Sequence, residues 1–367
     1  MKWKKHLYSL KPYQPGRPIE EVKQEYQLEE VIKLASNENP YGFSPMVAEK
    51  LNQTDWSLAI YPDGAAVDLR KYLSDYLGVQ ENQLIFGNGS DNLIQIIAGA
   101  LLSPGLNTVM STGTFSQYSH NAILEQAEIR EVPQINGGHD LEGILKQIDD
   151  QTSIVWICSP NNPTGVYINE KDLQDFLNKV PRDVLVVFDA AYYEYVTAPD
   201  YPRLKPLIEQ YDNLIILHTF SKIYGLAALR IGYGMANEEI IRMLEPAREP
   251  FNVSTIAQKA AMAAIADQDF IHACKEKNTA GLNKFYEFCQ TNGLSYYPSQ
   301  ANFILIETGF PGNEVFEYLM SKGIIVRSGQ ALGFPTSIRV TVGSPEQNQA
   351  VMRELAGFLQ SKKEKAK

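Results

Sequence analysis

Three short apolar runs in the middle of the chain predict buried β-strands. They cover residues 154–158, 184–188 and 214–217, and each is rich in β-branched residues without alternation of apolar and polar positions. Strands of this kind lie in a sheet that is covered on both faces. Helical patterns separate them, at 171–179 and 206–211. The order strand, helix, strand predicts a parallel sheet with right-handed crossovers.

Polar side chains follow each of these predicted strands. Asn162 comes after the first, Asp189 and Tyr192 after the second, and Lys222 after the third. In open parallel sheets ligands gather at the carboxyl ends of the strands. The shared placement of these four residues therefore predicts a functional site at that edge of the sheet.

An earlier segment predicts a place for an anion. The strand-like residues 84–86 run through small residues into an apolar helix near residues 93–98. Unpaired backbone N–H groups and the helix dipole favour a negative charge at such a junction. The segment is neither a Walker loop nor a dinucleotide fingerprint, because Asn92 stands where the last glycine is needed. Ordinary helix capping by Asn88 or Ser90 explains the same pattern.

The pattern changes after Pro246. Short strand-like runs at 302–306, 323–327 and 338–342 alternate with helical stretches, which predicts a smaller α+β domain. The fold class that we expect is α/β, with a mostly parallel sheet sandwiched by helices and a second, smaller α+β domain. We expect the large domain to cover residues 41–245. An arm of residues 1–40 and the segment 246–367 would form the rest.

Composition narrows the functional classes. The chain has 367 residues, 44% of them hydrophobic, and a formal charge of −10 with a pI near 5.2. This charge argues against nucleic acid as a partner. Three scattered cysteines and five histidines without ligand spacing indicate neither disulfides nor a metal site. No apolar run approaches membrane-spanning length, so we expect a cytoplasmic protein.

The segment 219–230 carries candidate chemistry. A lysine amine that is partly desolvated beside another cation loses proton affinity and becomes a nucleophile. Ser221 and Arg230, on either side of Lys222 in the sequence, are residue types that hold phosphate. Together they fit an anchor for pyridoxal phosphate (PLP). A solvated lysine after a strand is an equally good interpretation of this segment alone.

Several motifs together resemble the fold-type I PLP aminotransferases over nearly the whole chain. They are the segment 159–165, the pair Asp189-x-x-Tyr192, and Ser221-Lys222 followed by Arg230, in that family's order and approximate spacing. Within the family, residues 10–18, 34–42 and 219–233 look like the histidinol-phosphate aminotransferase branch. Asn92 and Gly113 depart from this pattern, where Glu and Pro are commoner.

The resemblance implies a role for each residue around the cofactor. Lys222 would form an imine with PLP and move the proton, Asp189 would pair with the pyridine nitrogen, and Phe115 would stack on the ring. Asn162 and Tyr192 would hydrogen-bond the phenolic oxygen of the ring. The phosphate would be held by Ser90, Asp91, Ser221 and Arg230.

The resemblance also implies substrates and a partner. Tyr61 would reach the phosphate of a second subunit, which implies a homodimer. Arg327 and Arg339 would hold the anionic end of the substrate, with Tyr13 and Asn37 lining the same pocket. The implied reaction transfers the amino group of L-histidinol phosphate to 2-oxoglutarate, a step of histidine biosynthesis.

Four other functions stay open. On the same scaffold the chain could be an aromatic amino acid aminotransferase or a decarboxylase of threonine phosphate, because the fold does not decide which substrate bond breaks. From other classes it could be a nucleotide-dependent oxidoreductase, against which the missing glycine argues, or a non-catalytic PLP-fold sensor. A sensor would need a partner domain, and no segment with a basic recognition helix is seen.

Overall fold

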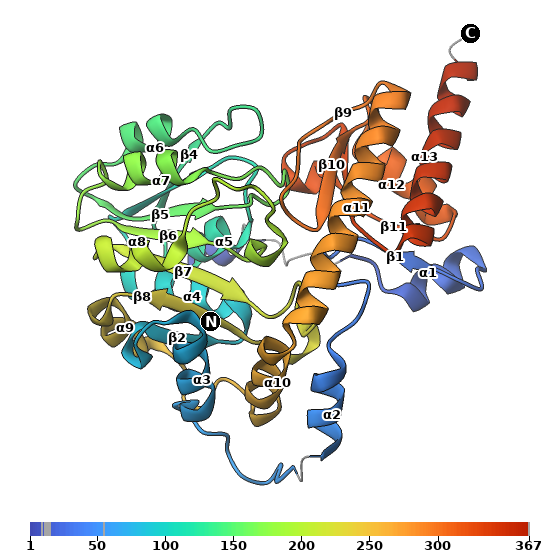
Figure 1. The fold of residues 1–367 in the computed structure, drawn as a ribbon. Helices are drawn as coiled ribbons and strands as arrows, with labels where there is room; N and C mark the ends of the chain where they lie inside the picture. Colours follow the sequence, from blue (N-terminus) through green and yellow to red (C-terminus); the bar gives the residue numbers. More distant parts are fainter. Residues whose placement is uncertain (9, 11–15, 54–55, 366–367) are drawn as a thin grey trace.

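The computed structural model describes residues 1–8, 10, 16–53 and 56–365. These residues form a large domain around a seven-stranded sheet and a smaller domain around a four-stranded sheet (Figure 1). None of the described helices is long and apolar enough to cross a membrane.

The seven-stranded sheet is parallel except for one strand. Its order is β2 (Leu84–Gly87), β8 (Gly232–Ala236), β7 (Leu214–Thr219), β6 (Leu185–Asp189), β5 (Thr152–Cys158), β3 (Asn107–Ser111) and β4 (Glu128–Val132). The three strands expected from apolar runs are β5, β6 and β7, which pair in parallel. The strand β8 runs antiparallel to both of its neighbours.

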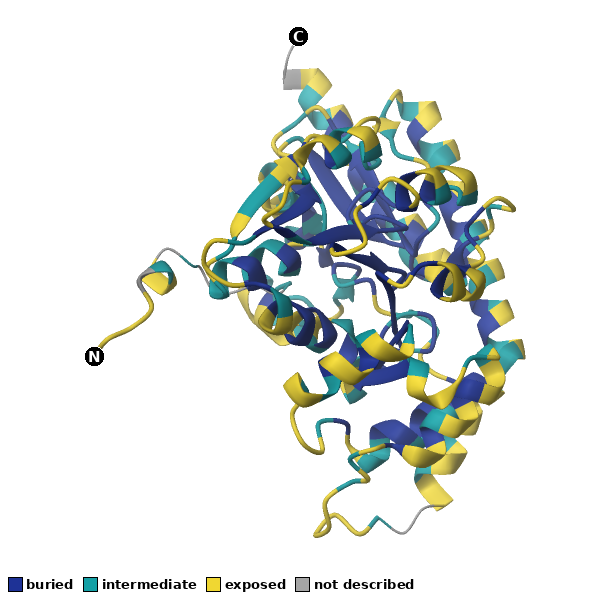
Figure 2. Ribbon diagram, turned by 90° about the vertical axis from the view of Figure 1, so that its left-hand side faces the viewer, coloured by how far each residue is buried: buried dark blue, intermediate teal, exposed yellow. Residues whose placement is uncertain are grey.

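Helices cover both faces of this sheet. One face packs against α3 (Val67–Leu77), α6 (Leu141–Gln147), α7 (Glu170–Leu177), α8 (Leu204–Gln210) and α10 (Thr255–Ala266). The other packs against α4 (Gly89–Leu101), α5 (Gln117–Leu124) and α9 (Glu238–Leu244). Apart from the edge strand β4, the strands are mostly buried, while the outer faces of the helices are exposed (Figure 2). This covering explains why the central strands β5, β6 and β7 are largely apolar.

The smaller domain holds an antiparallel sheet. Its order is β12 (Arg327–Ser328), β13 (Ser337–Thr341), β10 (Phe303–Glu307) and β9 (Ser295–Tyr296). The helices α11 (Gln268–Asn292), α12 (Gly312–Ser321) and α13 (Pro345–Lys365) complete it. Residues 323–327, expected to be one strand, are divided between two sheets, because β11 (Ile324–Ile325) pairs with the N-terminal arm while β12 pairs with β13.

The N-terminal arm joins the smaller domain. It contains a short 3-10 helix (Lys5–Tyr8), α1 (Ile19–Tyr26) and β1 (Ile32–Lys33), and β1 pairs in parallel with β11. The helix α2 (Pro45–Gln53) follows and lies against α10. The arm thus crosses from the small domain to the large one just where the site residues Ser36 and Asn37 lie.

The apolar core of the large domain continues past residue 245. It includes Val253, Ala257 and Ile265, and also Cys274 near the start of α11, whereas Leu282 farther along α11 belongs to the core of the small domain. A helix that contributes to both cores is a structural connection rather than a flexible linker. We therefore propose that the domain boundary lies within α11.

Candidate active site

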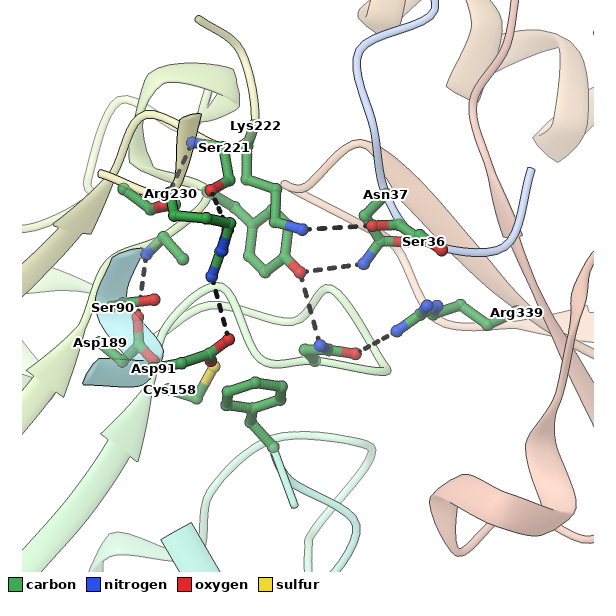
Figure 3. Close-up of a pocket in the computed structure, with 15 residues that line it drawn as sticks. Ser36, Asn37, Ser90, Asp91, Cys158, Asp189, Ser221, Lys222, Arg230 and Arg339 are labelled. Carbon is green, nitrogen blue, oxygen red and sulfur yellow. Dashed lines mark hydrogen bonds and ion pairs between the residues drawn. The ribbon is translucent and has the colours of Figure 1, made fainter. Parts of the chain in front are cut away.

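A cavity of about 170 Å³ lies at the carboxyl ends of β5, β6 and β7 (Figure 3). The sequence predicted most of the residues that line it: Asn37, Ser90, Asp91, Phe115, Asn162, Asp189, Tyr192, Ser221, Lys222, Arg230 and Arg339. Residues more than 300 positions apart thus meet in one pocket. The parallel sheet explains much of this, because its strands all end at the same edge.

One end of the cavity is suited to an anion. Arg230 Nη1 donates to Ser221 Oγ at 3.1 Å, and Nη2 donates to Asp91 Oδ2 and to the Asn88 carbonyl oxygen, both at 3.4 Å. At Gly89, the first residue of α4, a Cβ atom would come within 2.7 Å of Nη2. Because Gly89 has no side chain, the guanidinium can approach the amino end of α4.

The backbone of Arg230 is strained. Its φ of 51° lies in the left-handed region, which is costly for a residue with a side chain. The same helix end carries Ser90 and Asp91, whose backbone N–H groups belong to the first turn of α4. A cation, a hydroxyl and a helix N-terminus converge here, which is the donor set that binds a phosphate group.

A buried carboxylate lies next to this end. Asp189 Oδ2 accepts a hydrogen bond from the Tyr118 hydroxyl at 2.7 Å, and Oδ1 accepts one from the Ala191 N–H at 3.2 Å. Burial raises the pKa of Asp189 to about 6, against the opposing effect of these hydrogen bonds. A nearby cationic group would favour the ionised form, so Asp189 is suited to pair with a protonated nitrogen.

The amine of Lys222 lies in the same cavity. Its Nζ donates to the Ser36 carbonyl oxygen at 3.3 Å and is 5.7 Å from the centre of the Tyr192 ring. Burial lowers the pKa of Lys222 to about 8, and the positive charge of Arg339 adds to this effect. A large share of the lysine is therefore neutral slightly above neutral pH, as a nucleophilic amine requires.

A hydrogen-bond network closes the far end of the cavity. The Tyr192 hydroxyl accepts from Asn37 Nδ2 at 2.9 Å and from Asn162 Nδ2 at 3.4 Å. Arg339 Nη1 donates to Asn162 Oδ1 and Nη2 to the Ala35 carbonyl oxygen, both at 2.6 Å. The network joins the arm, the large domain and β13 of the small domain (Figure 3).

The residues fit PLP as a resident cofactor. The anion-binding end suits its phosphate, Asp189 suits its pyridine nitrogen and Lys222 suits its carbonyl carbon. The ring of Phe115 lines the cavity and can cover a flat heterocycle. The space that Gly89 leaves for Arg230 is the specific structural sign of this fit, since any side chain there would displace the guanidinium.

Three predicted residues are not brought to this cavity. Tyr61 is 78% exposed and stacks on Phe251, with ring centres 4.8 Å apart. Arg327 pairs with Arg339 across β12 and β13 but is not among the residues lining the cavity. Tyr13 lies outside the described residues.

Sequence reasoning missed residues that line the cavity or support its lining. Tyr118, the partner of Asp189, is fully buried and stacks on Trp156 with ring centres 4.9 Å apart. Its position in α5, three residues after Phe115, was the available signal, and the two rings meet edge-on with centres 5.6 Å apart. Ser36 and Thr219 also line the cavity; they lie within the segments 34–42 and 219–230, but neither was singled out as a site residue.

The chain belongs to the family of class I and II aminotransferases, whose model matches residues 29–355. It is 62% identical over 362 residues to the histidinol-phosphate aminotransferase of Geobacillus sp. (strain WCH70), covering 99% of each chain. It is 58% identical over 360 residues to the histidinol-phosphate aminotransferase of Bacillus subtilis (strain 168), covering 98% of this chain and 100% of that protein.

A solved structure agrees with these relatives. The crystal structure of histidinol-phosphate aminotransferase from Sinorhizobium meliloti in complex with pyridoxal-5'-phosphate has a TM-score of 0.90 to this chain. The two share 26% identity, and the match covers 98% of each chain. The predicted fold class is therefore confirmed.

Proposed function

We propose that this protein is a PLP-dependent aminotransferase of histidine biosynthesis. It transfers the amino group of L-histidinol phosphate to 2-oxoglutarate and forms imidazole-acetol phosphate and L-glutamate. The observation that carries this proposal is the 62% identity, over 99% of each chain, to a protein named histidinol-phosphate aminotransferase. The amine, carboxylate and anion-binding groups of the cavity support the reaction class.

When bound, PLP supplies a carbonyl carbon that reacts with amines and a ring that accepts electrons. Lys222 Nζ would take the proton from the substrate Cα and deliver it to the neighbouring cofactor carbon as general base and acid. Asp189 would keep the pyridine nitrogen protonated, because its ionised carboxylate and the cationic nitrogen stabilise each other. Tyr192 and Asn162 would hydrogen-bond the phenolic oxygen.

The cofactor phosphate would bind at the amino end of α4. The backbone N–H groups of Ser90 and Asp91, the Ser221 hydroxyl and the Arg230 guanidinium are the donors. Asp91 also presents a carboxylate to Arg230, which neutralises part of the cationic charge until a phosphate competes for it. Phe115 would cover the ring and exclude water from its face.

Both substrates carry an anionic end: the donor has a phosphate, and the acceptor has a second carboxylate. A guanidinium fork suits both. We assign this role to Arg339, with Asn37 beside it, and extend it to Arg327 and Tyr13 from the family resemblance. Arg339 is 6% exposed, and its fork bridges the arm and the large domain.

We also propose a homodimer in the cytoplasm. The ring of Tyr61 is exposed, although it stacks on Phe251, and would reach the phosphate of a second subunit. The three cysteines, all described and unpaired, are compatible with a reducing compartment. A mixture of two inactive variants, Tyr61→Ala and Lys222→Ala, tests the shared site. Mixed dimers would hold one intact site, so activity should appear only after subunit exchange.

Steady-state rates separate the possible substrates. We expect kcat/KM with histidinol phosphate and 2-oxoglutarate to exceed the values with phenylalanine and tyrosine, measured as glutamate formed. Threonine phosphate should release no carbon dioxide. If histidinol phosphate were the poorest amino donor of the set, the proposed substrate would be wrong while the reaction class could stand.

A further inference from the structure

A second cavity of about 430 Å³ lies apart from the active site, on the face of the large sheet that packs against α3 and α8. Its floor is formed by His218 of β7, Tyr233 of β8 and Tyr224, all buried. Its rim carries Arg203 and Lys205 at the start of α8, both exposed. We call this space the tyrosine–histidine cavity; its remaining polar lining residues are Tyr76, Tyr193 and Glu194.

His218 is the first sign that the cavity receives a ligand. It is 2% exposed, and among the described residues neither of its ring nitrogens has a hydrogen-bond partner. Its ring stacks on Tyr233 with centres 4.9 Å apart and meets the Tyr193 ring edge-on at 5.5 Å. A buried polar group without a partner is destabilising, so these two nitrogens favour a molecule that can form hydrogen bonds with them.

Glu194 is the second sign. Its side chain is only 12% exposed, and its Oε1 lies 4.0 Å from His218 Nδ1, too far for a hydrogen bond. Burial raises the pKa of Glu194 to about 8, although a hydrogen bond from Tyr224 and the charge of Lys275 act in the opposite direction. Burial also lowers the pKa of His218 to about 3, so this ring is neutral and cannot supply the missing cation.

The aromatic rings and the rim define the ligand. Tyrosine faces around a carboxylate attract an ammonium group. The rim carries Lys205 and also Arg203, whose Nε pairs with Glu170 Oε1 at 3.1 Å. These cations would repel a simple organic cation but would attract an anionic group attached to it.

We propose that the tyrosine–histidine cavity is a second, non-catalytic binding site for a small zwitterion. The ammonium group of the ligand lies near Glu194 and His218, and its carboxylate or phosphate lies at the rim beside Arg203 and Lys205. Small amino acids and their phosphorylated relatives belong to this class.

Binding should release a proton. The groups that face Glu194 are Tyr76 from α3, Tyr193 and His218 beside it, Tyr224 and Tyr233 below it, Lys275 from α11, and Arg203 and Lys205 at the rim. Of these, an incoming ammonium group acts most directly on Glu194 and stabilises its ionised form. At pH 7 Glu194 is mostly protonated before binding, so binding releases close to one proton and strengthens as the pH rises toward 8.

Three ligands of equal chain length test the proposal by calorimetry on the PLP-loaded enzyme. They are 4-aminobutyrate as zwitterion, butylamine as cation and butyrate as anion. We expect 4-aminobutyrate to bind most tightly, butylamine more weakly and butyrate not at all. The change Glu194→Gln should weaken 4-aminobutyrate by at least about tenfold, the value of one charge-assisted hydrogen bond. The matched control Glu317→Gln, at an exposed position of α12, should change nothing.

A spectroscopic measurement separates this cavity from the active site, where amines also bind. The five histidine side chains can be labelled with nitrogen-15, and His218→Gln identifies the His218 signals. We expect 4-aminobutyrate to shift them in the unaltered enzyme but not in Glu194→Gln. Arg203→Ala, on the exposed rim, should weaken 4-aminobutyrate but not butylamine. Unshifted His218 signals at saturating ligand, or equal binding to Glu194→Gln, would overturn the proposal.

Discussion

The two ends of the active-site cavity are built in different ways. The end suited to phosphate comes entirely from the large domain, where Ser221, Arg230 and α4 follow strands of one sheet. The opposite end is assembled from Ser36 and Asn37 of the arm, Asn162 of the large domain and Arg339 of the small domain. One end is thus fixed by a single core, and the other depends on how two domains and an arm meet.

This difference separates two tasks. A cofactor that stays bound benefits from groups preorganised on one rigid sheet. Two substrates that bind in turn need a wall that can adjust, and an interface between domains supplies it. We therefore expect changes at the phosphate end to alter cofactor affinity, and changes at the opposite end to alter substrate kinetics.

The largest effect is expected at the residue between the two ends. Replacing Lys222 by alanine removes the only amine lining the cavity in the described part of the chain, so kcat should fall by at least about 10³-fold. Glutamate formation in single-turnover experiments measures the loss. Lys171→Ala, on the surface of α7, is the control. Turnover by Lys222→Ala at more than a few per cent of normal would contradict the assigned role.

Arg339→Ala tests the adjustable end. It removes the bonds to Asn162 and Ala35 together with the charge, so kcat/KM for both substrates should fall by about 10²-fold while cofactor stays bound. Because the charge of Arg339 lowers the pKa of Lys222, the same change should raise that pKa and move the corresponding limb of the pH profile upward. Arg339→Lys keeps the charge and should leave the limb near its original position.

Arg230→Ala tests the rigid end. The change removes a cation from the phosphate donors and should raise the dissociation constant of PLP by about 10-fold to 100-fold, with a smaller change in substrate KM. Equilibrium dialysis against free PLP measures it. Arg230→Lys retains the charge without the guanidinium fork, so its dissociation constant for PLP should lie between those of the unaltered enzyme and Arg230→Ala. Unchanged PLP affinity together with raised substrate KM would reverse the division between the two ends.

The two ends also differ in what the sequence can reveal. Asp189, Ser221 and Lys222 follow apolar strands directly, so local pattern and the geometry of parallel sheets were enough to bring them together. Arg339 is an ordinary strand residue in sequence, and only the family resemblance pointed to it. Its place depends on pairing between β10, β13 and the arm, which are separated by up to 304 residues.

Two features of the fold could not be predicted from the sequence, for similar reasons. The division of residues 323–327 between β11 and β12 depends on which partner each half pairs with. The continuation of the large core into α11 depends on packing against α10 and its neighbours. Neither leaves a mark on the local pattern of apolar positions, because the partners of each segment lie far away in the sequence.

The smallest effect is expected from a change at Tyr118. It distinguishes a hydrogen-bonding role of this residue from a packing role. Tyr118→Phe keeps the ring stacked on Trp156 but removes the hydroxyl that donates to Asp189 Oδ2. Because that bond lowers the pKa of Asp189 from the value that burial alone would give, its loss should raise the pKa. The acidic limb of kcat/KM should then move upward by about one pH unit, as one hydrogen bond to a charged group predicts.

The matched control for this change is another tyrosine–aspartate pair. Tyr167 donates to Asp200 Oδ1 at the same distance of 2.7 Å, but at an exposed position away from the cavity. Tyr167→Phe should therefore leave the pH profile unmoved. If both variants lowered activity without shifting the acidic limb, Tyr118 would serve packing alone, and the rigid end of the site would not extend to the residue behind Asp189.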